Sequence, residues 1–182
     1  GFLLMVVIYR VFRRTRPRTV RRIFGKGQIL SAAFMAFSHG SNDGQKGMGI
    51  IALALFLNGN LTELDIPLWV MFVCATTIGV GTAVGGWRVI RTIGLRMTKL
   101  EPVNGFAAET SAALLIVGAS RFGIPLSTTH AIGSAIIGVG ATRRLSAVRW
   151  GVAGEVVGTW VLTWPGCMLL GYLLGLLFQA IF

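Results

Sequence analysis

The chain has 182 residues, of which 54% are hydrophobic and only 13% are charged, and its mean hydropathy is +0.74. Soluble domains usually carry about 25% charged residues, so this composition excludes an ordinary soluble fold and indicates an all-α integral membrane protein. The net charge of +11 does not indicate a nucleic-acid partner, because most Lys and Arg residues lie in joints between apolar segments, at 10–26, 88–99 and 143–149.

Residues 1–27 combine a short apolar run with a basic stretch. GFLLMVVIY is about half as long as a membrane span and ends in arginines, so we interpret it as the end of a truncated helix. RVFRRTRPRTVRR is then expected to be a basic cytoplasmic loop, and it can also contact anionic lipid headgroups. The chain is therefore expected to be the C-terminal part of a longer protein.

Residues 28–182 are expected to form one transmembrane repeat that begins with a long segment, 29–57. As one straight helix this segment would be about 43 Å long, against about 30 Å of membrane hydrocarbon. Its middle carries several glycines and a cluster of polar side chains. We therefore expect a discontinuous helix over 29–57, because non-helical backbone inside a membrane is tolerated where it lines a cavity. The acidic loop that follows is expected outside the cell.

Three further segments complete the predicted repeat. Residues 68–87 form an ordinary span that returns to the cytoplasm. Residues 105–142 contain two short apolar pieces around the turn SRFGIP, which favours a re-entrant helical hairpin, although two full spans also satisfy the flanking charges. Residues 150–182 are too long for one straight span and contain Pro165, so we expect a kinked helix divided between Thr163 and Gly166, with the C-terminus outside.

Two polar stretches, SHGSNDGQK at 38–46 and PLSTTH at 125–130, lie where the predicted helices begin again. A helix N-terminus offers unpaired N–H groups and a partial positive charge, which makes it a site for phosphate-like anions. Many secondary transporters build their substrate sites from such discontinuous helices near the middle of the membrane. The side chains expected to add donors or caps are Ser41, Asn42, Ser127, Thr128 and Thr129.

The negative charge of Asp43 would repel a bound anion, so an anion site here makes sense only if a cation binds beside the anion. Na⁺ would take the Asp43 carboxylate, the Asn42 amide oxygen and backbone carbonyls, or H⁺ would protonate Asp43 or Glu109. Glu109 is alternatively an acid bonded to nearby hydroxyls such as that of Thr110. Lys46 is expected to pair with Asp43, with contact to the substrate as the alternative.

Other interpretations of these polar residues were weighed against the anion site. His39 and His130 could bind a metal together with Asp43, but no His or Cys spacing supports this, so we expect both to pack and hydrogen-bond at the site. Ser127, His130 and Asp43 could also serve an intramembrane hydrolase, although no nucleophile-elbow pattern is present. Arg121, at the tip of the hairpin, either attracts anions or bonds to carbonyls of the turn.

HGSNDGQKGMGI (39–50) and GIPLSTTHAIGSAIIGVG (123–140) resemble, in order and separation, two motif regions in the C-terminal half of the inorganic phosphate transporter (PiT) family. The resemblance implies a symporter that imports phosphate with Na⁺ or H⁺ by alternating access. Such proteins have two inverted repeats, each with a broken helix and a re-entrant hairpin. The resemblance also implies that the phosphate or cation site is lined by Asn42, Asp43 and Gln45, and that the anion is cradled by Ser127, Thr128 and Thr129.

The resemblance further implies the setting of this chain. It would be a multi-pass protein of the plasma (inner) membrane, with its basic loops in the cytoplasm and the N-terminal repeat of the same protein as its partner. No enzyme activity and no cofactor beyond the coupling ion are expected, and a homodimer is possible. The alternatives are a permease for sulfate or another oxyanion, the intramembrane hydrolase, and a non-transporting structural or assembly subunit. The sequence leaves the choice between Na⁺ and H⁺ open.

Overall fold

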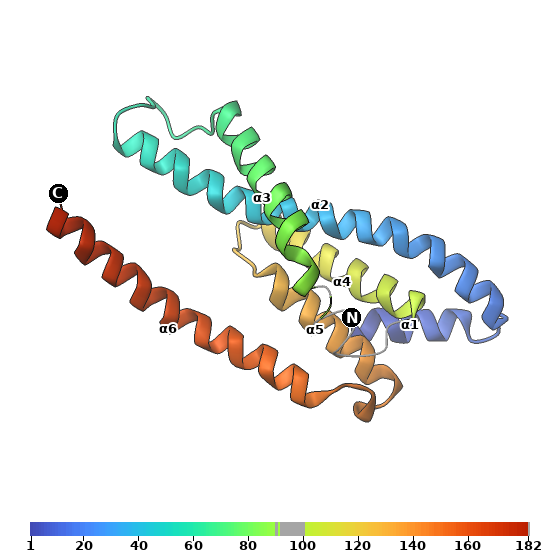
Figure 1. The fold of residues 1–182 in the computed structure, drawn as a ribbon. Coiled ribbons are helices and arrows are strands. Elements are labelled where there is room, and N and C mark those ends of the chain that lie inside the picture. Colours follow the sequence, from blue (N-terminus) through green and yellow to red (C-terminus); the bar gives the residue numbers. More distant parts are fainter. Residues whose placement is uncertain (90, 92–100, 182) are drawn as a thin grey trace. The chain divides into compact units, whose positions relative to one another are not determined.

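The computed structural model describes residues 1–89, 91 and 101–181, and its regular elements in that part are helices. The chain divides into two units, Gly1–Val148 and Arg149–Phe182. Most of the basic joint predicted at 88–99, and Phe182, lie outside the described residues. In chain order (Figure 1) the helices are α1 (Phe2–Phe12), α2 (Pro17–Leu57), α3 (Leu68–Val89), α4 (Pro102–Arg121), α5 (Thr128–Arg143), the short 3-10 helix η2 (Leu145–Ala147) and α6 (Trp150–Ile181).

Helix α2 is continuous over 41 residues, so the predicted break within 29–57 is wrong (Figure 1). The polar side chains do not interrupt the helix, because they find partners that leave its backbone hydrogen bonds in place. The Ser38 hydroxyl donates to the Phe34 carbonyl one turn earlier, and the Asn42 amide donates to the Leu126 carbonyl, outside α2. A helix of this length extends for about 61 Å.

The same helix includes residues 17–27, which were expected to belong to a basic loop. Pro17 is its first residue, where a missing N–H costs nothing because the first N–H groups of a helix have no partner within it. The arginines that follow have good helix propensity. The non-helical connection between α1 and α2 is therefore only residues 13–16.

The core of the first unit lies where α4 packs between α2 and α5. Helix α4 buries four alanines and one large apolar residue, Ile116, which is fully buried. Small residues allow helices to approach closely, as is common between membrane helices. Gly138 of α5 has the same effect on α1, since a side-chain carbon there would lie 3.1 Å from the backbone nitrogen of Phe2. The buried alanines are Ala107, Ala108, Ala112 and Ala113.

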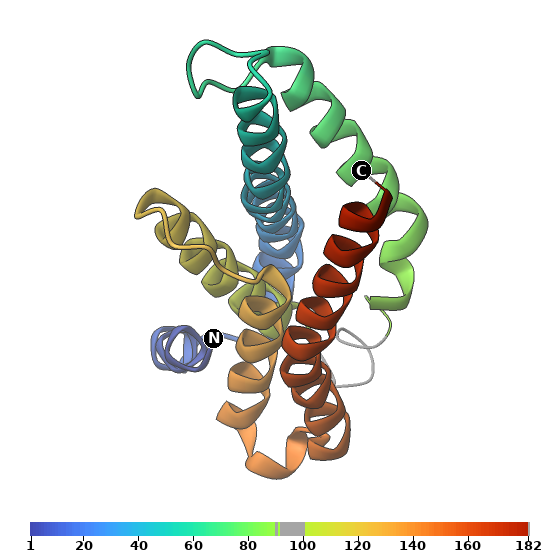
Figure 2. The ribbon, with the colours of Figure 1, turned by 90° about the vertical axis from the view of Figure 1, so that its left-hand side faces the viewer.

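Helices α4 and α5 form the two helical arms predicted within 105–142, joined by residues 122–127. Figure 2 shows this extended connection running from the end of α4 back to the start of α5. Gly123 has a positive φ of 68°, which glycine adopts without strain. At the other end of the hairpin, Arg143 donates to Glu101 at 2.8 Å. The insertion of this hairpin as a re-entrant element stays a prediction.

Three of the described helices are long and apolar enough to cross a membrane: Leu68–Trp87, Pro102–Arg121 and Trp150–Ala180. The first confirms the helix predicted at 68–87. The last is α6, which continues through Pro165, so the predicted division between Thr163 and Gly166 is wrong. A proline removes only one backbone N–H, whereas ending a helix inside the membrane would leave several backbone groups without partners.

Replacing Ala113 by leucine is expected to destabilise the fold, because Ala113 is fully buried in α4 and the larger side chain has no space. Overpacking of this kind typically costs about 1–3 kcal/mol. The thermal unfolding midpoint in detergent, followed by size-exclusion chromatography, should therefore fall. Ala54→Leu, at an exposed position of α2, is the matched control and should leave the midpoint unchanged. Equal midpoints for the two variants would contradict the packing described above.

Candidate functional site

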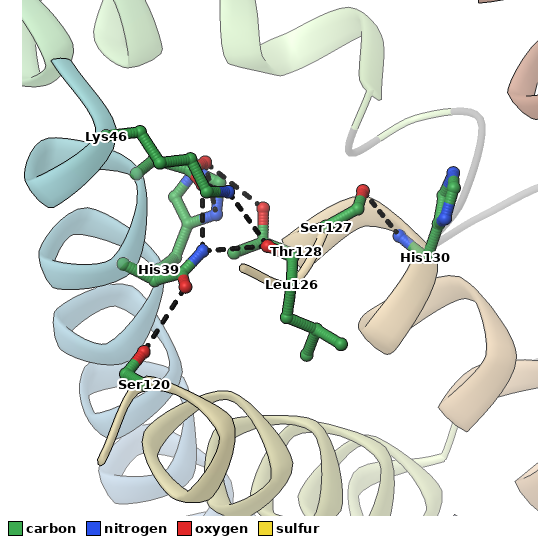
Figure 3. A network of polar contacts seen from close by, with 9 residues as sticks. His39, Lys46, Ser120, Leu126, Ser127, Thr128 and His130 are labelled. Atoms are coloured by element: carbon green, nitrogen blue, oxygen red, sulfur yellow. Dashed lines mark hydrogen bonds and ion pairs between the residues drawn. The ribbon is translucent and has the colours of Figure 1, made fainter. Parts of the chain in front are cut away.

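A polar network joins the middle of α2 to the connection that precedes α5 (Figure 3). The Asn42 side-chain amide donates to the Leu126 carbonyl at 3.0 Å and to Asp43 Oδ1 at 3.0 Å. One turn later on α2, Lys46 Nζ donates to the same two groups, at 2.8 Å to the carbonyl and 2.9 Å to Asp43 Oδ1. The Leu126 carbonyl therefore accepts from two side chains of α2 and holds the hairpin connection against that helix.

The hairpin contributes two hydroxyl donors to this network. Ser120, near the end of α4, donates to Asn42 Oδ1 at 3.2 Å, and Thr128, at the start of α5, donates to Asp43 Oδ2 at 3.2 Å. Asn42 and Thr128 are almost fully buried, at 4% and 3% exposure, so their polar atoms depend on partners within the protein. On α2, His39 Nδ1 lies 3.6 Å from Asp43 Oδ2. Asp43 is thus the residue at which α2 meets the start of α5.

Ser127 is the N-cap of α5, and its side chain accepts a hydrogen bond from the backbone N–H of His130 at 3.4 Å. This confirms the helix start predicted at PLSTTH. The N-terminus of a helix carries a partial positive charge, and its first N–H groups have no partner within the helix. The side chain of His130 points away from His39 and Lys46 in Figure 3. The contact is a backbone cap, which differs from the side-chain Ser–His bond that would activate a serine nucleophile.

The network combines groups that suit a cation with groups that suit an anion. The Asp43 carboxylate, the Asn42 amide oxygen and the Leu126 carbonyl are hard oxygen ligands of the kind that hold coupling ions in transporters. The N-terminus of α5, with the hydroxyl of Ser127 at its N-cap, is suited to an anion. Within the part of the chain that the structure describes, no three His, Cys, Asp or Glu side chains are grouped as a metal site would require.

Glu109 lies in a second polar cluster, between α4 and the first half of α2. The Ser31 hydroxyl donates a hydrogen bond to its carboxylate, and the side chain of Gln28 lies against α4 at Gly105. Gly105 leaves room for Gln28, since a side-chain carbon at that position would clash with the Gln28 amide. Asn104, which precedes Gly105 in the sequence, is buried. Its side-chain oxygen Oδ1 has no hydrogen-bond partner within the described part of the chain. The hydrogen-bond partner of Glu109 is thus Ser31 of α2, whereas the alternative drawn from the sequence was a nearby hydroxyl such as that of Thr110.

The structure does not bring every predicted site residue into these two clusters. The side chains that take part are His39, Asn42, Asp43, Lys46, Glu109 and Thr128, with Ser127 as the adjacent cap, bonded by the backbone N–H of His130. The others are exposed on their helices and take part in none of the contacts described above; they are Ser41, Gln45, Arg121 and Thr129.

Four contributing groups were missed by the sequence analysis. Gln28 and Ser31 carry a usable signal, because two polar residues three positions apart share one face of a helix. Ser120 stands in the turn SRFGIP, where it was treated only as a turn residue. The Leu126 carbonyl has no sequence signal, since every residue has a carbonyl and only the fold decides which one is left to accept.

Comparisons with known proteins bear on the whole chain. It is 48% identical to a probable low-affinity inorganic phosphate transporter of Rhizobium meliloti, over 95% of this chain and 52% of that protein. It is 42% identical to a probable low-affinity inorganic phosphate transporter of Bacillus subtilis, over 100% of this chain and 55% of that protein. The chain thus spans about half the length of the curated relatives it matches.

A solved structure, "The sodium-dependent phosphate transporter", matches with a TM-score of 0.72 and 30% identity, covering 87% of this chain and 41% of that one. Residues 3–171 match the Phosphate transporter family. These similar proteins are transporters and not enzymes, which removes the hydrolase alternative. The family match over most of the chain, together with three helices of membrane-spanning length, shows that this chain is a membrane protein of the Phosphate transporter family.

Proposed function

We propose that this chain forms the C-terminal half of a symporter that imports inorganic phosphate together with Na⁺ or H⁺. The observation that carries the proposal is the meeting of Asp43, Asn42 and Lys46 on α2 with the N-terminal end of α5, through Leu126 and Thr128. Oxygen ligands for a cation and a helix end for an anion lie together there, as the coupled movement of the two ions requires. The relatives' names support phosphate as the anion.

On the anion side, phosphate would bind at the N-terminus of α5. Its first N–H groups and the Ser127 hydroxyl would donate to phosphate oxygens, and Thr128 would join them once its hydroxyl leaves Asp43 Oδ2, to which it donates in this structure. Gln45 and Thr129 are exposed, and we expect them to face the second repeat, which would supply the remaining ligands. The same donors fit sulfate, so the choice of anion is part of the test. The proposed phosphate ligands are Asn42, Gln45, Ser127, Thr128 and Thr129.

On the cation side, the Lys46 ammonium bridges Asp43 Oδ1 and the Leu126 carbonyl. It therefore sits against two of the oxygens that a bound Na⁺ would use. Lys46 neutralises Asp43 while no ion is bound, and a coupling ion at Asp43 would compete with it. Glu109, hydrogen-bonded by α2, is the second acid available to a coupling proton or cation. The name of the solved neighbour supports Na⁺.

Transport would proceed by alternating access, with this repeat and its inverted partner moving around a fixed site near the middle of the membrane. The hairpins of the two repeats would then face each other across the substrate. The protein would lie in the plasma membrane with its basic helix ends in the cytoplasm and its C-terminus outside, because positively charged residues are retained on the cytoplasmic side.

The direct test is uptake of radiolabelled phosphate into proteoliposomes containing the full-length protein, with the Na⁺ and pH gradients imposed separately. We expect one of the two gradients to accelerate uptake and unlabelled phosphate to compete. Sulfate that competes as well as phosphate would point to a general oxyanion permease. Uptake that neither gradient accelerates would rule out symport.

Asp43→Asn is expected to reduce gradient-driven uptake by at least about tenfold, equivalent to about 1.4 kcal/mol. The amide keeps the size of the side chain but loses the charge that pairs with Lys46 and with a coupling ion. Asp65→Asn is the matched control, because Asp65 lies in an exposed loop and accepts a hydrogen bond from its neighbour's backbone N–H. If Asp43→Asn protein transports like the control, Asp43 has no role in coupling.

Lys46→Gln separates the two roles considered for this lysine. If the ammonium competes with the coupling ion, its removal lowers the half-saturating ion concentration, by about fivefold at most, because a pair this exposed is worth about 1 kcal/mol or less. The KM for phosphate should then change less than the ion dependence. Lys26→Gln, at an exposed position of the same helix, is the control. A raised KM for phosphate with unchanged ion dependence would instead show that Lys46 contacts the substrate.

A further inference from the structure

A cavity of about 440 Å³ lies where the end of α1, the start of α2, the start of α4 and the end of α5 meet. Its volume is in the range of small-molecule sites in proteins. None of the residues of the Asp43 network or the Glu109 cluster lines it. Three arginines and one acid line it, together with apolar and aromatic side chains; the charged residues are Arg13, Arg21, Arg143 and Glu101.

The charges around this cavity do not balance. Arg143 donates to Glu101 at 2.8 Å, so one arginine and the acid neutralise each other. Arg13 and Arg21 form no ion pair with any carboxylate within residues 1–89, 91 and 101–181. Two positive charges therefore remain at one cavity. Guanidinium groups suit phosphate oxygens particularly well, because their planar fork can form two parallel hydrogen bonds.

The surroundings of the cavity distinguish a lipid from a free ion. Leu3, Val7 and Val11 lie four residues apart on one face of α1 and are 78%, 55% and 66% exposed. The cavity begins where this apolar face gives way to arginines, which is the pattern of a helix passing from hydrocarbon into the headgroup region. Apolar residues also line the cavity itself, including Phe12 and Val20. An apolar lining gives no favourable contact to a free inorganic anion, whereas it can pack against the hydrocarbon part of a phospholipid.

We propose that this cavity binds the headgroup phosphate of an anionic phospholipid. Arg13 and Arg21 hold the phosphate, and the apolar lining packs against the glycerol and the first acyl carbons. A lipid bound here would contact the ends of α1, α2 and the hairpin at once. It would hold these helix ends together at the membrane surface, away from the transport site.

The test uses the full-length protein in detergent, titrated with phosphatidylglycerol or phosphatidylcholine and followed by native mass spectrometry. We expect phosphatidylglycerol to bind about tenfold more tightly than phosphatidylcholine, since each basic residue near anionic lipid contributes measurably. The double variant Arg13→Gln/Arg21→Gln should lose most of this preference. The control Arg14→Gln/Arg18→Gln removes the same charge from two exposed arginines that do not line the cavity, and it should keep the preference.

Three outcomes would overturn the proposal. The first is equal binding of both lipids by the wild-type protein. The second is an equal loss of the preference in both double variants, which would indicate diffuse surface charge. The third is displacement of phosphatidylglycerol by inorganic phosphate at equal concentration, which would indicate a free-anion site. If Arg13→Gln/Arg21→Gln protein does not fold, Arg13→Lys/Arg21→Lys keeps the charge but loses the bidentate geometry. That pair should still weaken phosphatidylglycerol binding, by about threefold, and unchanged binding would contradict the assignment.

Discussion

The carboxylate of Asp43 is the constraint on which the arrangement of this membrane protein depends. A charge between packed helices is costly unless it is paired and hydrogen-bonded. Asp43 meets this requirement with Lys46 from its own helix and Thr128 from the hairpin, while Asn42 and Lys46 both reach the Leu126 carbonyl. The need to satisfy one acid thus fixes where the start of α5 lies against α2.

The continuity of α2 is what makes these contacts compatible. In an unbroken helix, residues three or four positions apart lie on one face, so His39, Asp43 and Lys46 point to the same side. A break within this stretch would have separated them. The discontinuity that an anion site needs is supplied by the hairpin, whose extended connection ends at the N-cap Ser127. Helix α2 provides the face with the charged residues, and α5 provides the helix N-terminus.

Sequence patterns predicted where helices occur better than they predicted where a helix is broken. The hairpin arms and the span at 68–87 follow from apolar lengths and turn residues. The Asp43–Lys46 pair was expected from opposite charge, because a break in the helix was predicted in that stretch. The predicted break in α2 and the predicted division at Pro165 were wrong. A glycine within a helix costs only about 1 kcal/mol, and a proline removes one backbone hydrogen bond. Both cost less free energy than leaving several backbone groups without partners in a membrane. Ser120 and the Leu126 carbonyl became partners only through the tertiary packing of the hairpin, which no local pattern encodes.

The Asp43 network and the Glu109 cluster both connect α2 to the hairpin formed by α4 and α5. Ser31 bonds Glu109 on α4, and Asn42 bonds the connection to α5; the two positions on α2 are separated by about 16 Å along the helix axis. A movement of the hairpin relative to α2 would therefore strain both sets of bonds together. An ion or proton that changes the charge of Asp43 or Glu109 would alter the same contacts. In the proposed symport, the coupling ion would act by loosening or tightening the hairpin against α2, at the end of α5 where the phosphate would bind.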